Sequence, residues 1–298
     1  MFVCLLLLLL LLLAGGGFWL SGAYLVTATG LVVRHNHCQN DDELELMGGG
    51  GLIQEDAHLT CLGCLFHNNS ANLGGGLMVF SHRAAVVLEF TRFTSNSANV
   101  GGAVALQNSA SSSFTSCEFF GNSATSSAGA VYSTRSLPVV FSFCNFQNCT
   151  CSEDLCEGGT LALHDGRANL TSSTIRGGKA GFGGGIFTTK VRVLLDNTEM
   201  TNCQAGRQGG AVEVTSFSEI DISHSEVTNC SAGQSGGGIF ASATCTVATI
   251  DSKFENLTSL ANGGVMYLEY NSKCTSYSST FRFNRAGKLC GVVWCGVV

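Results

Sequence analysis

A short phrase containing paired glycines recurs along most of this chain, and it constrains the fold more than any other feature of the sequence. Each copy joins a small polar turn, an asparagine, a glycine pair and an aliphatic residue, as FTSNSANVGGAV at 93–104 illustrates. A repeat length between about 20 and 50 residues predicts a solenoid or another stack of repeats. The last glycine before each aliphatic run recurs at a nearly constant spacing within that range, at Gly51, Gly76, Gly102, Gly129, Gly159, Gly185, Gly210, Gly238, Gly264 and Gly291.

Composition narrows the class of stack to a β-solenoid. The 38 glycines and the long Ser, Thr and Asn stretches oppose helical repeats, because glycine costs about 1 kcal/mol in a helix interior. The spine of leucine-rich repeats is absent, and a propeller blade needs roughly 40 residues. The single proline, Pro138, fits continuous parallel strands, where proline cannot donate a ladder hydrogen bond.

Each unit alternates short apolar runs with turns, which predicts three short strands and one full coil of a parallel β-helix. One unit has apolar runs at 76–80 and 85–90, followed by a polar turn that reaches Asn96. We expect an all-β fold of about nine to ten coils, each of about 26–27 residues and stacked about 4.8 Å apart. The rule for parallel crossover connections favours a right-handed coil.

The repeated glycines and asparagines have structural roles in such a coil. Glycine pairs permit positive φ and a close backbone approach where the chain turns into a strand, and the anchors Gly76, Gly102, Gly210 and Gly238 are assigned this role. Asparagine tolerates the left-handed conformation of a turn, and stacked copies predict an amide ladder. The predicted ladder consists of Asn69, Asn96, Asn122, Asn148, Asn202, Asn229, Asn256 and Asn284.

Two tetrapeptides extend the pattern and connect it to a family. GGAV occurs at 101–104 and 209–212, GGGI at 183–186 and 236–239, and FxxN at 66–69, 93–96, 119–122 and 281–284. Over about residues 48–291 the chain resembles the chlamydial polymorphic outer membrane proteins, which carry repeated GGA(I/L/V) and FxxN motifs. The resemblance implies a right-handed parallel β-helix of pectate-lyase-like type on a secreted or cell-surface, adhesin-like protein.

The chain also departs from that family. Met200 or Val227 stands where phenylalanine is expected in some coils, and no membrane barrel is expected between the last motif and Val298. The ending GVVWCGVV is apolar, whereas a solenoid normally needs a polar terminal cap. We therefore expect a repeat domain over 48–298 that is truncated or uncapped at its C-terminal end.

The N-terminal segment predicts export. Leu5 to Leu13 is an unbroken leucine run with the length of a signal-peptide core, and Ser21-Gly22-Ala23 offers a small-x-small cleavage site. This assigns 1–23 to a signal peptide and 24–47 to an N-terminal cap or linker. An uncleaved signal anchor that reaches about Val33 is the alternative. Either interpretation places the repeats outside the cytosol, in the extracellular space or at the cell surface.

Cysteine usage agrees with an oxidising compartment, because the 15 cysteines become an even 14 when Cys4 leaves with the signal. Cys203 and Cys230 follow the turn asparagine of adjacent coils, which predicts a disulfide between them. One local bridge is expected within the cluster Cys149, Cys151 and Cys156. A lone Cys61-x-x-Cys64 and the tract at 35–38 are better explained without a metal, since a second CxxC is missing.

Five Asn-x-Ser/Thr triplets are glycosylation candidates on exposed turns of an exported protein. They lie at Asn68, Asn148, Asn169, Asn229 and Asn256. The net charge of −6, with 12% charged residues, provides no basic stripe for nucleic acid. The resemblance to surface adhesins implies cell-surface glycans or proteins as partners, and the N-terminal apolar segment predicts membrane association.

A catalytic alternative depends on carboxylates. Parallel β-helices also host polysaccharide lyases and glycoside hydrolases, which need two or three carboxylates that converge on one face. The candidates are Asp196, Asp221 and Asp251. Asp196 and Asp221 lie equally far from their preceding glycine anchors, which predicts that they stack, while Asp251 lies further from its anchor and falls out of line. No basic residue recurs beside them, and no nucleophile or phosphate-binding motif occurs.

The sequence therefore predicts an exported β-helical module that serves adhesion or surface structure without catalysis and without a cofactor. Carbohydrate cleavage on the same fold is the second hypothesis. A third is that the repeats are a rigid spacer for a further C-terminal domain.

Overall fold

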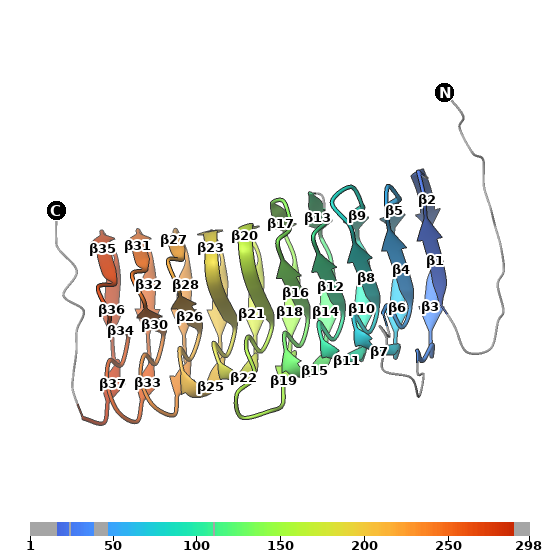
Figure 1. Ribbon diagram of the computed structural model, residues 1–298. Helices are drawn as coiled ribbons and strands as arrows, with labels where there is room; N and C mark the ends of the chain where they lie inside the picture. The colour runs from blue at the N-terminus through green and yellow to red at the C-terminus, as the bar shows by residue number, and fades with distance from the viewer. Residues whose placement is uncertain (1–16, 24, 39–46, 110, 289–298) are drawn as a thin grey trace.

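The computed structural model is an elongated parallel β-solenoid with no helix among the described residues, which are 17–23, 25–38, 47–109 and 111–288. Its short strands lie side by side in regular coils from the N-terminal end to the C-terminal end (Figure 1). The predicted all-β solenoid is confirmed, with about nine turns. All of the pairings between its named strands are parallel.

Strands at equivalent positions of successive coils pair into four ladders. The first two ladders form one 18-stranded sheet, because β20 and β23 are long enough to run through both. The first ladder contains β1 (Phe18–Ser21), β4 (Gly51–Gln54), β8 (Leu77–Phe80), β12 (Val104–Gln107), β16 (Val131–Thr134), β20 (Leu161–Thr171), β23 (Ile186–Asp196), β26 (Val212–Thr215), β30 (Ile239–Ser242) and β34 (Met266–Leu268). The second contains β2 (Leu25–Thr29), β5 (His58–Leu62), β9 (Ala85–Glu89), β13 (Ser112–Thr115), β17 (Val139–Ser142), β20, β23, β27 (Glu219–Ser223), β31 (Thr246–Ile250) and β35 (Lys273–Tyr277).

The third and fourth ladders are separate sheets of 10 and 9 strands. The third contains β3 (Val32–Arg34), β6 (Leu65–His67), β10 (Arg92–Thr94), β14 (Glu118–Phe120), β18 (Asn145–Gln147), β21 (Thr174–Arg176), β24 (Glu199–Thr201), β28 (Glu226–Thr228), β32 (Lys253–Glu255) and β36 (Thr280–Arg282). The fourth contains β7 (Ser70–Leu73), β11 (Ser97–Val100), β15 (Ser123–Ser127), β19 (Thr150–Cys151), β22 (Lys179–Phe182), β25 (Gln204–Gln208), β29 (Ser231–Ala232), β33 (Thr258–Ser259) and β37 (Arg285–Ala286).

A coil therefore has up to four strands, one more than the apolar runs predicted. The additional strand is the polar segment of the fourth ladder, such as SANV in β11. Its backbone groups are paired by the coils on both sides, and pairing does not require apolar side chains. Hydrophobicity alone could not reveal it.

The stack also begins earlier than the glycine motifs indicate. β1, β2 and β3 pair in parallel with β4, β5 and β6, so these three strands already form a coil of the stack, and β2 and β3 lie within the cap or linker predicted over 24–47. This coil is longer than the next one, because Phe18 pairs with Gly51 whereas Gly51 pairs with Leu77. The small-x-small site at 21–23 lies between β1 and β2. The leucine run lies outside the described residues.

The glycine pair has two physical roles, which Gly101 and Gly102 illustrate. Gly101 has a φ of 66°, and an added Cβ on Gly102 would lie 2.3 Å from the carbonyl oxygens of Gly129 and Ser123 in the next coil. Only glycine permits both conditions. Gly210 is equivalent to Gly102, since its Cβ would lie 2.1 Å from the oxygen of Gly237. Gly76 and Gly238 lie one position later and face the core, where the neighbouring motif has alanine.

The core is a continuous column inside the coil. Each third-ladder strand contributes its central side chain, and Phe66, Phe93, Phe119 and Phe146 stack with ring centroids 4.6 to 5.1 Å apart. In the following coils Ile175, Met200 and Val227 occupy this position before Phe254 and Phe281 resume it. All but Phe281 are buried. The first residue of each FxxN motif is therefore the one that packs into this column.

The amide ladder forms only in part of the stack. Asn69 Nδ2 donates to Asn96 Oδ1 at 3.0 Å, and Asn96 Nδ2 donates to Asn122 Oδ1 at 3.0 Å. All three are fully buried, which confirms the predicted ladder for this segment, and Asn36 extends it by one coil. Asn284 has the same orientation at the far end, where its Oδ1 accepts from the backbone of Leu257.

The predicted ladder is wrong for the asparagines of the intervening coils. They are exposed and have φ between 52° and 56°, so they occupy the left-handed turn position one residue earlier. Their inward neighbour takes the ladder position, as Cys203 does after Asn202 and Cys230 after Asn229. The residues displaced from the ladder are Asn148, Asn202, Asn229 and Asn256.

No segment in the described part of the chain forms a helix of the length and apolar character needed to cross a membrane.

Candidate functional site

The three candidate aspartates lie on the second ladder and its following corner, but they do not stack as predicted. Asp196 Oδ1 contacts His224 Nδ1 at 2.8 Å and accepts from Ser223 Oγ at 2.7 Å, and Asp251 Oδ2 lies 4.0 Å from His224 Nε2. Asp221 instead forms an ion pair with Arg192 at 3.2 Å. The structure therefore brings Asp196 and Asp251 together around a histidine and leaves Asp221 in a separate pair.

Two one-residue shifts in register explain why Asp196 and Asp221 do not stack, although they lie equally far from their preceding glycine anchors. The last glycine of GGGI, Gly185, aligns with Ala211 rather than with Gly210. The later coil also has one more turn residue before β27, so that Thr189 pairs with Thr215 while Arg192 pairs with Glu219. Asp196 consequently pairs with Ser223, two residues beyond Asp221.

The Asp196–His224–Asp251 cluster is solvated, with the His224 side chain 62% exposed. The hydrogen bond with His224 is the main cause that lowers the pKa of Asp196, and the same bond raises the pKa of His224. Exposed charge pairs of this kind contribute little to stability. The cluster therefore places a hydrogen-bonded carboxylate and imidazole at an exposed corner of the coil.

The disulfide candidates separate into two groups. Cys149, Cys203 and Cys230 are buried in the main core at the asparagine-ladder corner, whereas Cys151 and Cys156 pack together with Ala124 and Ala180 in a small second core. All five are free thiols in this structure. Cys274 is disulfide-bonded.

Four of the five glycosylation candidates share one corner of the coil. Asn68, Asn148, Asn229 and Asn256 are exposed with positive φ directly after a third-ladder strand. Asn169 differs, because it is half-buried within β20 and is paired on both sides, with Val140 and Leu194. Whether any of them is modified stays a prediction, and the corner position makes four of the side chains accessible.

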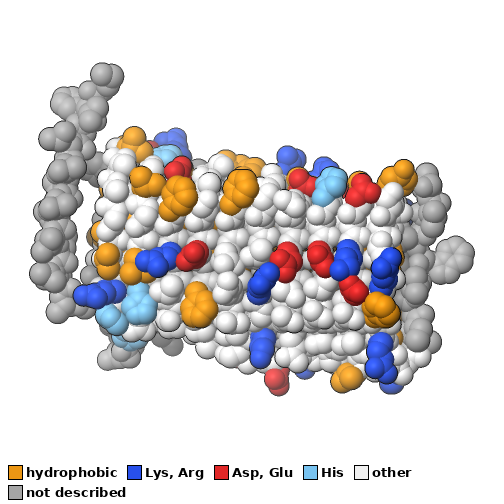
Figure 2. Space-filling model, turned by 180° about the vertical axis from the view of Figure 1, so that it is seen from behind, with side chains coloured by type: hydrophobic (Ala, Val, Ile, Leu, Met, Phe, Trp, Pro, Cys, Tyr) orange, Lys and Arg blue, Asp and Glu red, His pale blue; other side chains and the backbone are white. Residues whose placement is uncertain are grey.

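Stacking of equivalent positions gives the surface a row pattern. Charged and large hydrophobic side chains run in rows along the solenoid on the face that Figure 2 shows. Ion pairs connect neighbouring coils, as between Arg176 and Glu199 and between Lys253 and Glu226, both at 2.8 Å. Several exposed aromatic residues stand at corners with positive φ, including Phe90, Phe143 and Phe217.

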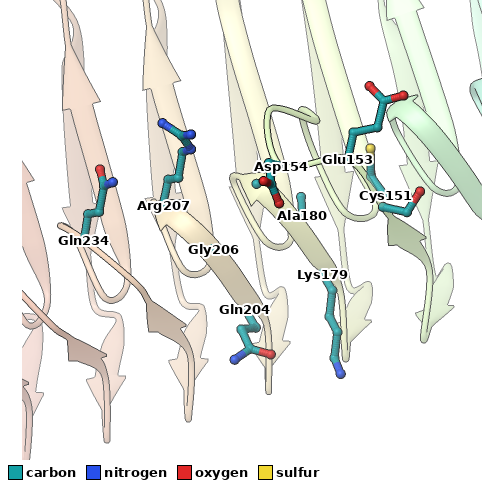
Figure 3. A pocket seen from close by; sticks show the side chains of 11 residues that line it. Cys151, Glu153, Asp154, Lys179, Ala180, Gln204, Gly206, Arg207 and Gln234 are labelled. Atoms are coloured by element: carbon teal, nitrogen blue, oxygen red, sulfur yellow. The ribbon is translucent and has the colours of Figure 1, made fainter.

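A groove on the fourth ladder has a volume of about 450 Å³. Its wall is the turn after β19, in the longest repeat, and this segment protrudes from the stack in Figure 1. β22 and β25 form its floor, and Gln234 of the next coil closes its far end (Figure 3). Four successive coils thus contribute to one site.

Polar groups line this groove, which we call the fourth-ladder groove. Glu153 and Asp154 come from the wall, Lys179 and Gln204 from the strands, and Arg207 from the end of the floor. In the described structure neither Lys179 nor Arg207 forms an ion pair, although the Arg207 guanidinium lies 5.6 Å from the Phe182 ring centroid. Two free cations, two carboxylates and two amides offer hydrogen-bond donors and acceptors to a polar ligand.

Gly206 keeps the floor of the groove open. It aligns with Gly181 and Gly233, where an added Cβ would lie 2.2 Å from a backbone oxygen of the preceding coil. At Gly206 the nearest atom to an added Cβ is 3.8 Å away, an ordinary contact, and its φ is not positive. The fold therefore does not require glycine here, and the missing side chain serves only to leave space.

A second set of titratable groups lies on the outer face of the first ladder but is partly or fully buried. Glu213 lies between Phe187 and Phe240 in its row, is 4% exposed, and has an Oε2 atom with no hydrogen-bond partner in the described structure. Desolvation, followed by the charges of Glu157 and Glu269, raises the pKa of Glu213 to about 9. His164 Nε2 lies 3.3 Å from Glu157 Oε2, but the two are misaligned for a hydrogen bond. No ligand can reach the Glu213 carboxyl without displacing its cover.

Neither the fourth-ladder groove nor the buried Glu213 was predicted from the sequence. The cysteine-rich coil of residues 131–160, in which Val131 pairs with Leu161 across the longest interval between glycine motifs, was the available signal for the groove. An insertion in a regular repeat creates an extra loop. Glu213 follows a glycine motif directly and therefore resembled a solvated strand residue.

No group of three or more His, Cys, Asp or Glu side chains in the described part of the chain is arranged to hold a metal ion. Cys61 and Cys64 are buried core residues. Compared with protein-family models, with curated proteins and with solved structures, the chain matches none.

Proposed function

We propose that this chain is an exported recognition module of the cell surface, adhesin-like in type, that binds oligosaccharides through the fourth-ladder groove without converting them. The resemblance of the GGA(I/L/V) and FxxN repeats to polymorphic outer membrane proteins supports a surface role. The parallel β-helix also supports a surface role, because it provides a rigid scaffold. The observation that carries the proposal is Gly206, whose missing side chain leaves a polar groove open where the fold does not require glycine.

The ligand class follows from the lining. Sugars present many hydroxyl groups and little charge, and amides, carboxylates and guanidinium groups are the side chains that pair with them. Arg207, Gln204 and Asp154 provide one of each along the groove. The floor includes Ala180, Gly181 and Gly206, whose side chains are small or absent and leave room for a ligand.

Glycan-array binding of the secreted full chain tests the proposal, with Gly206→Trp as the main variant. Tryptophan fills the groove, so binding should fall at least about tenfold, which corresponds to about 1.4 kcal/mol. Arg207→Ala should weaken binding by a similar factor. Asn99→Trp is the matched control, because Asn99 is exposed at the equivalent register position of β11, outside the groove. Full binding by Gly206→Trp, or no binding by the unchanged protein, contradicts the proposal.

Carbohydrate cleavage is the second candidate function, and the contact between Asp196 and His224 favours it. A carboxylate that orients a histidine is a recurrent element of acid–base sites. A polyuronide-cleavage assay distinguishes the two functions. Turnover that is lost in Asp196→Ala but retained in Asp221→Ala would establish an enzyme at this corner and overturn the proposal of binding without conversion.

A further inference from the structure

Eight buried cysteines, none of them bonded in this structure, interact with one another in four pairs. Within each pair the partner thiol is the first cause of the altered pKa, raising it in one member and lowering it in the other. Only one pair was expected from the sequence as a defined disulfide. The pairs are Cys61 with Cys64, Cys117 with Cys144, Cys151 with Cys156, and Cys203 with Cys230.

Two pairs connect adjacent coils at a corner. Cys117 and Cys144 directly precede Glu118 and Asn145, which pair in the third ladder, and the backbone N–H of Asn145 donates to the Cys117 carbonyl at 2.9 Å. Cys203 and Cys230 have the same relation at the next corner, where the backbone N–H of Cys203 lies 3.4 Å from Cys230 Sγ. Neighbouring strands are about 4.8 Å apart, within the Cα separation of about 4.4–6.8 Å that a disulfide requires.

The third pair closes the wall of the groove. Cys151 and Cys156 pack in the same small core, and the turn between them is fixed by the Cys156 N–H, which donates to the Glu153 carbonyl at 3.0 Å. The backbone N–H of Gly181 on the floor contacts Cys156 Sγ at 3.2 Å. A bond between these sulfurs would hold Glu153 and Asp154 in place above β22.

We infer that the three pairs described above, Cys117 with Cys144, Cys203 with Cys230, and Cys151 with Cys156, are oxidised to disulfides in the exported protein, so that two of them join adjacent coils and one latches the wall of the fourth-ladder groove. Each pair loses two protons and two electrons as its S–S bond forms. A disulfide of small-molecule or protein type accepts them and is cleaved to two thiols. The inference shares the expectation of export with the proposed function, but it does not depend on ligand binding.

The structure also identifies cysteines that should stay reduced. Cys149 lies between Asn122 and Gly178 at its corner, and its thiol faces the Phe119 carbonyl at 3.6 Å. Cys245 lies in a row with Ser218 and Ser272, and its Sγ contacts the Ser242 carbonyl at 3.0 Å. Neither has a thiol at the same corner of an adjacent coil, so both act as internal negative controls.

Peptide mapping of the secreted full chain tests the inference. Free thiols are alkylated in denaturant without reductant, and the digest is then analysed by mass spectrometry. The three linked pairs should appear, each two hydrogen atoms lighter than its reduced form, while Cys149 and Cys245 are alkylated. Alkylation of both Cys117 and Cys144, or links that cross between the pairs, overturns the inference.

A double variant, Cys117→Ser with Cys144→Ser, provides a second measurement. Serine is the natural residue at this corner in later coils, where Ser173 Oγ accepts from the Cys144 backbone at 3.0 Å, so the fold should tolerate it. The variant should melt about 5–10 °C below the oxidised protein, and reductant should lower the Tm of the unchanged protein by more than that of the variant. An equal response to reductant in both proteins contradicts an inter-coil bond at this position. Disulfide mapping can fail while glycan binding persists, so the two proposals fail separately.

Discussion

The coils of residues 66–146 and those of residues 175–257 use the same backbone path with different interiors. The earlier coils stack phenylalanine rings at the centre of the third ladder and asparagine amides at the following corner. The later coils place Ile175, Met200 and Val227 at the centre and Gly178, Cys203 and Cys230 at the corner. The two positions lie three residues apart and do not change in the same coil, because Phe146 still occupies the centre where Cys149 already occupies the corner. The difference shows that the parallel path tolerates several ladder chemistries, while the glycine motif remains nearly constant.

The earlier and later coils differ in how completely their corner side chains pair the hydrogen-bonding groups of the backbone. Asn96 Oδ1 accepts from both the backbone N–H and the side-chain amide of Asn69, and Asn96 Nδ2 donates to the Phe66 carbonyl and to Asn122. A thiol is a weaker donor and acceptor. We therefore expect the earlier coils to be more sensitive to single substitutions at these positions than the later ones.

The largest effect is expected at the aromatic stack. Phe119→Ala removes a ring that lies between Phe93 and Phe146, at centroid distances of 5.1 and 4.6 Å, and should lower the free energy of unfolding by about 3–5 kcal/mol. Val227→Ala at the equivalent position should cost about 2 kcal/mol. Urea unfolding followed by circular dichroism measures both. Equal losses in the free energy of unfolding would mean that the earlier and later coils are equally well packed, and would contradict the difference inferred between them.

The second prediction concerns the corner. Asn96→Ala leaves the Asn69 amide groups and the Phe66 carbonyl without their partners in a buried site, which should cost about 2–4 kcal/mol. Cys230→Ala in the reduced protein should cost about 1 kcal/mol, because the N–H of Cys203 loses only a weak acceptor. The measurement is the same urea titration in the presence of reductant. A smaller loss for Asn96→Ala than for Cys230→Ala would contradict the role assigned to the amide ladder.

The same comparison explains which features the sequence could predict. Where FxxN is intact, the period and the residue types agree, and the ladder at Asn69, Asn96 and Asn122 follows from them. In the later coils asparagine remains but moves one residue earlier, to the left-handed turn position. A linear pattern cannot separate these two roles of asparagine, since both favour the same residue type. The register of a coil against its neighbour determines which of the two positions the asparagine occupies.

The candidate sites on the surface were less predictable for a different physical reason. Equal distance from a glycine anchor does not mean equal register when GGG replaces GGA and a turn gains a residue, so Asp221 was grouped with the wrong partners. The groove depends on contacts among four coils, and its informative residue, Gly206, is one of 38 glycines. Only the positions of the surrounding backbone atoms distinguish a glycine that the fold requires from one that it does not.

The third prediction concerns the buried carboxyl of the later coils. The raised pKa of Glu213, about 9, means that the folded protein holds a proton which the unfolded chain loses above about pH 4.5. Stability should therefore fall as pH rises between these values, by up to about 1.4 kcal/mol per pH unit. Glu213→Gln mimics the protonated carboxyl, so the variant should be more stable than the unchanged protein at pH 8, by about 1–3 kcal/mol.

Urea midpoints at pH 5, 7 and 9 measure this effect. Glu118→Gln is the control, because Glu118 is exposed on β14 in the earlier coils and forms no ion pair in the described structure. A pH slope that persists in Glu213→Gln would show that another group causes it. Because Glu213 lies in the later coils only, amide hydrogen exchange at pH 9 should locate the loosened region near β26 and its neighbours.

The smallest effect is expected at a corner that both halves share. Phe143 has a φ of 56° with a side chain that is 65% exposed, while Asn197 occupies the equivalent corner of a later coil with a φ of 50°. Asparagine tolerates this conformation better than phenylalanine, so Phe143→Asn should raise the free energy of unfolding by about 0.5–1 kcal/mol. Phe120→Asn is the control, since Phe120 is exposed to a similar degree but lies in a strand, where asparagine is unfavourable. A loss of stability in Phe143→Asn would show that the ring contributes packing at the corner, and the left-handed turns of the earlier and later coils would then not be interchangeable.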